Sequence, residues 1–538
     1  MENCEKYDTI QNMNAMKKED TYVFLDKDNF IKEIFAHDGY FVDQIPPCFS
    51  TESLAKAFDN LLFYDELIGS FSIKQIKAYP IELSVYKENI LRRTLSFPNI
   101  LAYIRLLGEL QKDFNIYKDL ISSNNSESKA IMLTTLDYPS NYRKSIMERN
   151  IKFSGNKYKL SIDIANCYPS IYSHSIAWAL LGKEVAKNMA LNPQLQDNIY
   201  KKADKIDKAN TKLKASETNG LITGPYSSRI ISEIVLGAID KILVDNGYEF
   251  SRYVDDYNFY FTNKYDCEKS ISNIATILAE FNLKINESKI KIEKYPFDIL
   301  EDYSSLFQQS FNKQYPAYNI LQKAAMLDQQ GKKGSYKYAF KLLRNNPQLR
   351  NKKSSEAFYL FYTLISIIIN RPMMARFAVE MISTLQVVFY ENEMVDKLND
   401  LLEKELDAHH DQEVLWLLYV ILRYGSKIKQ SNISKILNNS NDFAIMMILD
   451  LLKDHRKQIV DYDTKKSTIN RLIKKDLEKL EKELKLESLL TKRWFLKYEI
   501  NYYGLNPYGL FKTLKDNSPI YSELKNNNIN FYKRVFKR

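Results

Sequence analysis

The pattern of hydrophobic and polar positions divides the chain into two parts. From about residue 155 to 300, short stretches that alternate between apolar and polar residues are mixed with stretches of helical period, whereas beyond about residue 300 nearly every segment has helical period. The first part therefore predicts an α+β fold, and the second predicts a stack of amphipathic helices of roughly 12–20 residues. We place the boundary near Tyr303. The helices are expected to break at the following positions: 345–347, 370–372, Gly425 and 438–439.

A strand that ends in a carboxylate and a strand–turn–strand segment stand out in the first part. In residues 158–164, apolar residues alternate with polar ones, so one face of a strand is buried and Asp163 lies on the other face. In residues 250–261 (FSRYVDDYNFYF), aromatic and β-branched residues lie on both sides of Asp255 and Asp256. This pattern predicts two strands joined by a tight turn that carries both carboxylates.

Three segments of the second part raise separate expectations. Residues 357–369 form the longest apolar run, which is shorter than the roughly 20 residues that span a bilayer, so a buried helix is expected. Apolar residues from Ile469 to Leu484 repeat at spacings of three and four, which predicts a long solvated helix with a narrow apolar seam. That helix either packs in a bundle or also mediates self-association. The basic loop 331–353 is expected either to contact phosphates or to be a charged surface loop, with equal weight on each.

The composition is that of an ordinary globular protein. The chain has 538 residues, 45% of them hydrophobic and 27% charged, and this length exceeds what one hydrophobic core usually serves, so at least two domains are expected. The four cysteines are scattered, which argues against a disulfide framework or a structural zinc site. The first residues lack the pattern of a secretory signal, so we expect a cytoplasmic protein without membrane contact. A net charge of +10 favours a polyanionic partner without establishing one.

The three aspartates indicate a particular chemistry. Adjacent carboxylates such as Asp255 and Asp256 repel each other, and a bound divalent cation relieves that repulsion. Oxygen ligands suit magnesium, which also bridges to substrate phosphates. Asp163 and Asp255 together could hold two metal ions, an arrangement that activates an attacking hydroxyl and stabilises a leaving pyrophosphate. We therefore expect nucleotidyl transfer with Mg²⁺ as the cofactor and Mn²⁺ as the alternative.

Four motifs resemble those of the palm of reverse transcriptases. Residues 252–256 (RYVDD) resemble the Tyr-x-Asp-Asp signature, and residues 161–168 (SIDIANCY) resemble the first catalytic motif, which has an aromatic residue five positions after its aspartate. Residues 219–228 (NGLITGPYSS) resemble the glycine-rich element that supports the nucleotide and the template. Residues 286–289 (NESK) resemble the motif whose lysine assists phosphate chemistry. The motifs occur in the family's order and cover about residues 155–300.

This resemblance implies roles for the metal-binding and catalytic residues. It implies that Asp163, Asp255 and the backbone carbonyl of Ile164 bind the metal ions. It also implies that Asp256 and Lys289 complete the catalytic set. An exposed lysine without a catalytic role is the alternative for Lys289.

The same resemblance places Ile164, Tyr168, Gly224 and Pro225 at the incoming nucleotide. The Tyr168 ring would lie beneath the sugar, where a 2′-hydroxyl would clash with it, so deoxynucleoside triphosphates are the expected substrates. Packing in the core is the alternative role for Tyr168. A plain turn before a helix that starts near Ser227 is the alternative role for Gly224.

Further motifs resemble the bacterial abortive-infection polymerases of the AbiK kind. These motifs are 92–99 (RRTLSFPN), 164–178 (IANCYPSIYSHSIAW), 251–256 (SRYVDD) and 490–499 (LTKRWFLKYE). The resemblance implies a phage-defence enzyme that polymerises deoxynucleotides without a template, starts from a protein hydroxyl and leaves single-stranded DNA covalently attached to itself. It also implies a homo-oligomer, either a trimer or a hexamer.

The hydrophobic pattern and the motifs together predict the architecture. Residues 1–300 are expected to form a reverse-transcriptase-like domain, with fingers at about 50–155 and a palm at about 156–300. Residues 301–538 are expected to form an α-helical repeat-like domain in place of the usual thumb. The predicted fold is therefore α+β, followed by an all-α C-terminal domain.

A priming residue and a triphosphate site remain to be placed. A tyrosine that starts synthesis should lie near the N-terminus and reach the metal site, so Tyr7 is the first candidate, with Tyr22 and Tyr40 behind it. Arg92 and Arg93 are expected to neutralise the triphosphate of the nucleotide. The alternative for this pair is an exposed helix face.

Three other interpretations are kept beside the main one. A templated reverse transcriptase that acts with a structured RNA, as in retron-like systems, would have the same palm residues. An inactive nucleic-acid-binding scaffold is disfavoured because all three aspartates are retained. A helical ribonuclease of a common class is disfavoured because its Arg-x(4–6)-His signature does not precede His409, His410 or His455. His174 follows Asp163 by eleven residues and is expected to be a packed or helix-terminal histidine rather than a catalytic base.

Overall fold

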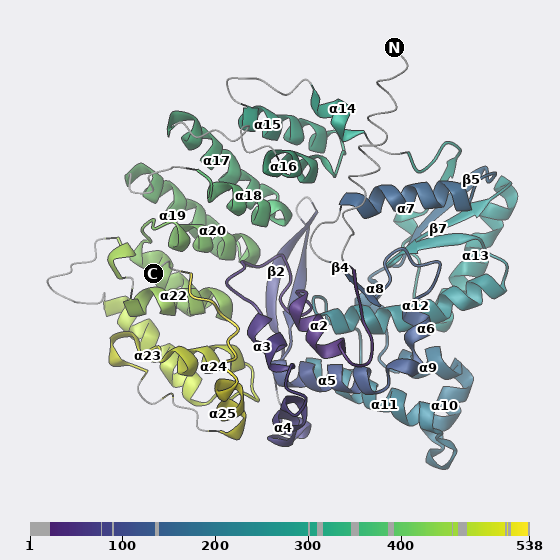
Figure 1. Ribbon diagram of the computed structural model, residues 1–538, viewed down its shortest axis with the longest axis horizontal. Helices are drawn as coiled ribbons and strands as arrows, with labels where there is room; N and C mark the ends of the chain where they lie inside the picture. The colour runs from purple at the N-terminus through teal and green to yellow at the C-terminus, as the bar shows by residue number, and fades with distance from the viewer. Residues whose placement is uncertain are drawn as a thin grey trace.

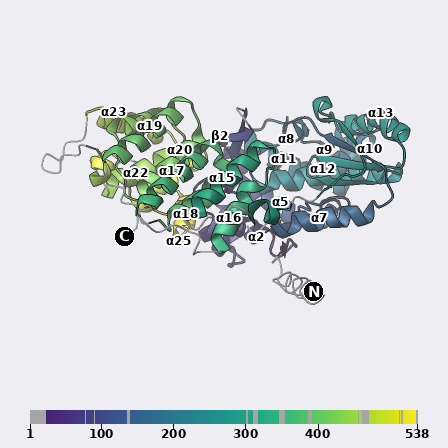
Figure 2. The same cartoon turned by 90° about the horizontal axis from the view of Figure 1, so that it is seen from above.

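The computed structural model describes most of the chain between residues 22 and 535. The described residues exclude 77, 89–90, 135–138, 300–301, 309–315, 346–353, 386–391, 455, 461–470, 512–513 and 515–517. The first part forms a small sheet with surrounding helices, and the second part forms a curved stack of helices (Figure 1). A long hairpin of two strands lies between them in that view, and the molecule is elongated when seen from above (Figure 2). An α+β part followed by an all-helical part is what the hydrophobic pattern predicted.

The sheet of the palm region has four antiparallel strands in the order β6-β7-β5-β8. The strands are β5 (Tyr158–Asp163), β6 (Phe250–Tyr253), β7 (Asp256–Phe261) and β8 (Lys291–Lys294). The strand predicted to end at Asp163 and the strand–turn–strand around Asp255 are both confirmed. In this register Asp163 pairs directly with Asp256, so the first catalytic motif and the Asp-Asp turn meet at one end of the sheet.

Helices complete the palm region, some of them packed on the sheet and others on neighbouring helices. They are α8 (Cys167–Ser170), α9 (Ser175–Leu181), α10 (Lys183–Leu191), α11 (Asn198–Thr211), α12 (Tyr226–Asp245) and α13 (Lys264–Glu280). Most of α12 is buried, including polar residues such as Glu233 and Asp240. A central helix buried on nearly all sides must pair its polar side chains internally. Those pairs are part of the candidate site.

The fingers region is built on a two-stranded hairpin and a buried helix. Its elements are β1 (Tyr22–Phe24), α2 (Phe30–Ala36), α3 (Glu52–Ala57), α4 (Phe63–Gly69), β2 (Ile81–Glu88), β3 (Leu91–Phe97), α5 (Ile100–Lys112), α6 (Lys118–Ile121), β4 (Met132–Thr134) and α7 (Pro139–Lys152). Asn99 caps α5 by accepting a hydrogen bond of 3.0 Å from the Leu101 amide. The Ser96 amide donates to the Thr223 carbonyl at 2.8 Å, so the end of β3 is joined to the loop before α12.

The second part of the chain is helical throughout its described residues. Its helices are α14 (Tyr303–Phe307), α15 (Pro316–Gln329), α16 (Ser335–Asn345), α17 (Ser354–Asn370), α18 (Ala375–Ile382), α19 (Asn392–Asp407), α20 (Asp411–Arg423), α21 (Gln430–Asn439), α22 (Asp442–Asp454), α23 (Arg471–Lys485), α24 (Trp494–Tyr503) and α25 (Pro519–Asn526). The predicted breaks are confirmed, because α16, α17 and α21 end at Asn345, Asn370 and Asn439 and because Gly425 follows α20. The prediction of a loop over residues 331–353 is wrong in its middle, where α16 forms because apolar residues at helical spacing pack inward.

The apolar run at 357–369 and the seam before residue 485 both pack inside the molecule. The run lies within α17, whose buried residues face the neighbouring helices. In α23, Ile473, Leu477, Leu480 and Leu484 are buried, and this helix packs on α21. The seam therefore packs in the bundle over its described residues, and self-association by this helix stays a prediction. Ile469 lies outside the described residues. Within the part of the chain that the structure describes, no helix is both long and apolar enough to cross a membrane.

The C-terminal segment returns to the fingers region. The Lys533 amide donates to the Cys48 carbonyl at 2.6 Å, and the Ser50 amide donates to the Phe531 carbonyl at 3.1 Å. The Phe49 ring lies 5.5 Å from the Tyr532 ring, within a larger cluster of buried aromatic rings. The helical region is thus held to the fingers by contacts between the two ends of the chain, which no local pattern in the sequence predicted.

Candidate active site

The three aspartates lie together at the end of the palm sheet. Asp163 is the last residue of β5, and Asp256 is the first residue of β7. The Ile164 amide donates to the Asp255 carbonyl at 3.3 Å, so the chain beyond β5 is joined to the turn between β6 and β7. The structure therefore brings together the residues that the sequence predicted as the metal-binding set.

The turn that carries Asp255 is held by a buried arginine. Val254 has a φ of +56°, a left-handed conformation that strains a β-branched residue. Nη1 of Arg252 donates to the Val254 carbonyl at 2.9 Å, and the guanidinium is fully buried. Its charge is matched by Glu233 and Asp240 of α12, each 2.7 Å away. The strained turn is therefore held in place by the buried ion cluster of Arg252, Glu233 and Asp240.

Crowding gives the site an excess of negative charge. Burial and the charge of Asp163 raise the pKa of Asp255 above its usual value, while Lys289 and Lys87 act in the opposite direction. Partial burial and the charges of Asp255 and Asp163 raise the pKa of Asp256 to about 6. Burial is the larger cause of both pKa shifts, and repulsion among the carboxylates adds to it when all three are ionised. A cation placed among them would relieve that repulsion.

Two polar side chains occupy the oxygens of Asp163. Nζ of Lys289 lies 3.1 Å from Oδ1, and Nδ2 of Asn286 donates to Oδ2 at 3.0 Å. The hydrogen bond to Asp163 raises the pKa of Lys289. Lys289 is exposed in a short turn before β8, so its ammonium group can move without disturbing the core. The structure thus places the predicted catalytic lysine on the predicted metal-binding carboxylate.

The three aspartates fit a hard divalent cation, although their side chains are not yet arranged as a complete coordination sphere. Among the described residues, no group of three or more His, Cys, Asp or Glu side chains is arranged to hold a metal ion as it stands. The three aspartates offer carboxylate oxygens, which suit magnesium-like ions. Asp163, Asp255 and Asp256 would hold such an ion after Lys289 and Asn286 shift away from Asp163.

Addition of Mg²⁺ is expected to raise the thermal unfolding temperature at about pH 7.5 and to have little effect at about pH 5. The folded-state pKa of Asp256 is about 6, above its usual value of 3.8, so its contribution to stability is present below about pH 4 and is lost as the pH rises through 6. A bound cation offsets that loss only where the carboxylates are ionised.

Thermal unfolding with MgCl₂ or with EDTA, at both pH values, measures this effect. The shift should shrink in Asp163→Asn and stay unchanged in Asp245→Asn, which removes an exposed carboxylate at the end of α12. An equal shift at both pH values would contradict the prediction.

Two of the predicted nucleotide-binding residues lie in the first catalytic motif, and two lie in the glycine-rich loop. Tyr168 lies in α8, and its backbone carbonyl accepts a hydrogen bond of 2.8 Å from the Leu221 amide. Burial raises the pKa of Tyr168 to about 12, so its hydroxyl stays protonated. Gly224 has a φ of +131°, and a Cβ there would lie 3.3 Å from the Ser96 carbonyl oxygen. Pro225 is buried and precedes α12 directly. The glycine-rich loop therefore links the palm to the fingers.

The side chains of the two predicted triphosphate-binding arginines have different surroundings. Arg92 forms a paired contact with Glu413, with distances of 2.9 and 2.7 Å, and so joins β3 to α20. Arg93 is exposed on β3, a strand rather than the helix considered as its alternative. The exposed Lys87 on β2 was not anticipated, yet its charge acts on Asp255. Only the register of the β2–β3 hairpin would have predicted that Lys87 acts on Asp255.

Side chains of α20 also bind the edge of β2 that does not pair with β3. The Ser84 amide donates to Oδ2 of Asp411 at 2.8 Å, and the Tyr86 amide donates to Oε1 of Gln412 at 3.1 Å. Side chains at the start of α20 thus satisfy backbone donors that an exposed edge strand would leave open. Together with Arg92, these contacts fix the hairpin against the helical region.

The remaining sequence-based candidates have different outcomes. Tyr7 lies outside the described residues, and Tyr22 begins β1 with a side chain that is not described. Tyr40 is fully buried and donates a hydrogen bond to the Pro98 carbonyl, so it cannot reach the metal site as a primer. His174 precedes α9 and pairs with Asp207. Its place at a helix terminus is the one that the sequence predicted.

A family match covers the region that carries the three aspartates. Residues 104–303 match the family described as reverse transcriptase (RNA-dependent DNA polymerase). The curated proteins contain no match. Among solved structures, the chain is similar to telomerase from Candida albicans in complex with a fragment of telomeric RNA, with 10% identity over 68% of each chain and a TM-score of 0.27. Apo telomerase from Candida tropicalis gives 13% identity over 64% of this chain and 68% of that one, with a TM-score of 0.29.

Proposed function

We propose that this chain polymerises deoxynucleotides at Asp163, Asp255 and Asp256. Residues 104–303 match a reverse-transcriptase domain, which makes the chain a nucleotidyltransferase of the reverse-transcriptase family. The observation that carries the proposal is the pairing of Asp163 with Asp256 beside the Asp255 turn. These carboxylates come from motifs about ninety residues apart and meet at one end of a sheet. A cation bound among them would relieve the charge repulsion there.

In this proposal, each residue of the site has its own role in the reaction. The three aspartates would hold Mg²⁺, which would supply Lewis-acid stabilisation of the phosphates and of the attacking hydroxyl. Lys289, which carries its positive charge at the edge of this cluster, stabilises the leaving pyrophosphate. Lys87 approaches from the fingers hairpin and neutralises part of the triphosphate. Tyr168 lies under the sugar and selects against a 2′-hydroxyl.

The finer function that we propose is template-independent synthesis in phage defence. The enzyme starts from a tyrosine hydroxyl of the protein, with Tyr7 as the proposed primer, and leaves single-stranded DNA attached. The support is the resemblance of four segments to abortive-infection polymerases, together with the helical region that follows the palm directly at α14. We also propose that the chain acts as a homo-oligomer, either a trimer or a hexamer, in the cytoplasm.

The test is an incorporation assay without template or primer. Purified protein is incubated with MgCl₂ and labelled deoxynucleotides, and the products are separated on denaturing gels before and after protease treatment. Label should migrate with the protein, become free-running DNA after proteolysis and disappear in Asp255→Asn. Tyr7→Phe should remove the attached product, whereas Asp245→Asn should leave it unchanged.

A templated reaction is the second candidate, because the matched family is described as RNA-dependent. If label appears only when an RNA template and a primer are supplied, the template-independent proposal fails and the templated one stands. If no label appears under either condition, an inactive scaffold is the remaining interpretation.

Lys87→Ala is expected to raise the KM for deoxynucleotides about 10-fold, because it removes a charged contact with phosphate. Its unfolding temperature should not change, since Lys87 is exposed. Steady-state kinetics with Lys74→Ala, another exposed lysine of the fingers region, provide the control. Arg93→Ala tests the original assignment in the same assay. A normal KM in Lys87→Ala together with a raised KM in Arg93→Ala would show that Arg93, and not Lys87, contacts the triphosphate.

A further inference from the structure

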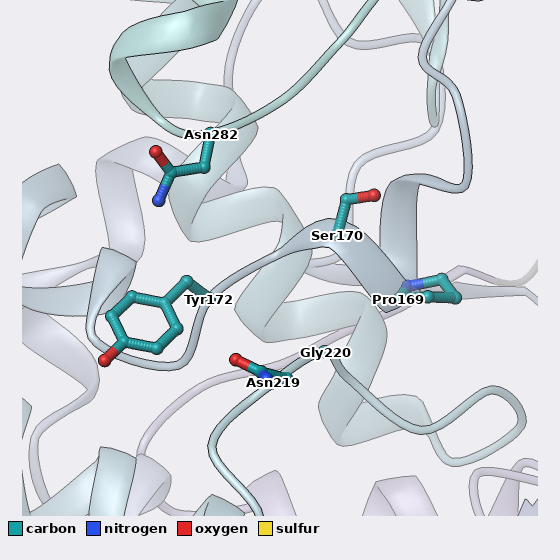
Figure 3. Close-up of a pocket in the computed structure, with 6 residues that line it drawn as sticks. All are labelled: Pro169, Ser170, Tyr172, Asn219, Gly220 and Asn282. Carbon is teal, nitrogen blue, oxygen red and sulfur yellow. The ribbon is translucent and has the colours of Figure 1, made fainter.

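A pocket of about 340 Å³ opens on the palm region beside the first catalytic motif. Its lining residues are Pro169, Ser170, Tyr172, Asn219, Gly220 and Asn282 (Figure 3). The three aspartates and Lys289 do not line it. Its volume falls at the lower end of the range for small-molecule pockets, roughly 300–1,000 Å³. The pocket is therefore a place for one small ring system, separate from the metal-binding carboxylates.

An aromatic ring with two amide groups characterises the pocket. In Figure 3 the side chains of Asn282, Tyr172 and Asn219 extend towards the same side, with the ring between the two amides. The Tyr172 ring is half-buried and is supported by the His174 ring at 4.7 Å and the Trp178 ring at 5.9 Å. A supported ring of this kind is a rigid stacking platform.

The polar groups around that ring are available to a ligand. Within the described part of the chain, the Tyr172 hydroxyl and the side-chain amides of Asn219 and Asn282 make no hydrogen bond. Each amide offers both a donor and an acceptor. No carboxylate or ammonium group lines the pocket. This set suits a flat, uncharged ring with donors and acceptors on its edge.

The backbone geometry keeps these groups together. Tyr172 and Asn219 form an isolated antiparallel bridge. A Cβ at Gly220 would lie 2.6 Å from the Pro169 carbonyl oxygen, so only glycine allows the two loops to approach this closely. Asn282 has a φ of +62°, a left-handed conformation that asparagine tolerates. The pocket is thus defined by close loop packing rather than by mobile side chains.

We propose that this pocket binds one unpaired nucleobase of a deoxynucleotide. The base stacks on the Tyr172 ring, and the amides of Asn219 and Asn282 hydrogen bond to its edge. Stacking on aromatic residues is the usual way in which proteins hold unpaired bases, and it tolerates all four of them. Asparagine amides also match the donor and acceptor pairs on base edges.

The pocket walls belong to segments that continue into the active site. Pro169 and Ser170 follow Tyr168, Gly220 begins the glycine-rich loop, and Asn282 precedes the turn that carries Lys289. A base bound here therefore holds a strand, or a second nucleotide, next to the catalytic motifs. A strand made without a template has unpaired bases along its whole length, so in that form the inference rests on the proposed function.

The test measures equilibrium binding of a labelled single-stranded oligodeoxynucleotide by fluorescence anisotropy. All proteins carry Asp255→Asn, so that polymerisation does not contribute to the signal. Tyr172→Leu and Asn282→Gly are compared with Tyr265→Leu, which removes an exposed tyrosine from α13. Asn282→Gly keeps a residue that accepts the positive φ while removing the amide. An abasic strand of equal length reports the backbone contribution alone.

Tyr172→Leu and Asn282→Gly are each expected to weaken binding about 10-fold, a loss within the range for one base stack, while Tyr265→Leu leaves it unchanged. The abasic strand should bind the unmodified pocket as weakly as the normal strand binds Tyr172→Leu. Equal affinity of all variants, or equal affinity for normal and abasic strands, would overturn the proposal.

A competition arm separates the two sources of the base. Displacement of the labelled strand by a free deoxynucleoside monophosphate assigns the pocket to a free nucleotide, whereas displacement only by unlabelled strand assigns it to DNA. The proposed function has its own readout, because incorporation is measured in protein with an intact Asp255. Binding without any incorporation would retain this site and reject the proposed synthesis.

Discussion

Replacing Asp255 with asparagine is expected to lower the rate of nucleotide incorporation on the order of 10³-fold, the magnitude at which removal of one preorganised charge-stabilising group acts. The substitution keeps the size of the side chain and removes the charge that holds a divalent cation. Burial and repulsion from Asp163 raise the pKa of Asp255, so its loss relieves strain instead of creating it. The variant should therefore be at least as stable to heat as the parent protein without added metal.

Initial rates of incorporation and thermal unfolding, measured on the same preparations, check this result. Asp245→Asn is the matched control, because it makes the same chemical change at an exposed position. If Asp255→Asn retains a rate close to that of the parent, the carboxylates at the end of the sheet are not the catalytic centre. If it loses activity together with its folded structure, Asp163→Asn provides the second measurement.

Replacing Arg252 with methionine is expected to destabilise the protein by about 3–5 kcal/mol, the range for removing one partner of a buried ion pair. The guanidinium is fully buried and is hydrogen bonded to Glu233 and Asp240 at distances of 2.7–3.1 Å. Its removal leaves two carboxylates inside α12 without a cation. It also removes the hydrogen bond to the Val254 carbonyl, so the catalytic turn loses its support.

Urea unfolding and incorporation kinetics separate these two effects. The triple variant Arg252→Met, Glu233→Gln and Asp240→Asn removes all three charges and should recover most of the lost stability. It should not recover the full incorporation rate, because Val254 still lacks its hydrogen bond. A single Arg252→Met variant as stable as the parent would show that the ion cluster does not hold α12 and the turn together.

Local patterns in the sequence were enough to predict the catalytic strands. The alternation before Asp163 and the aromatic residues around Asp255 specify strand and turn within a few residues, because side-chain direction alternates along a strand. The breaks between helices were equally local, since asparagine, glycine and proline favour turns and the ends of helices. The order of the four motifs then indicated which strands must meet.

Contacts between distant residues were decided only by the tertiary structure. Arg92 was predicted to bind phosphate, yet Glu413 on α20 pairs with it. Lys87 acts on Asp255 because of the path of the hairpin, and Tyr532 packs on Phe49 although they lie at opposite ends of the chain. The periodicity of a sequence reports which face of an element is buried but not which partner buries it. For that reason the sequence by itself determined the carboxylate set of this protein, and only the folded chain decided what surrounds and supports it.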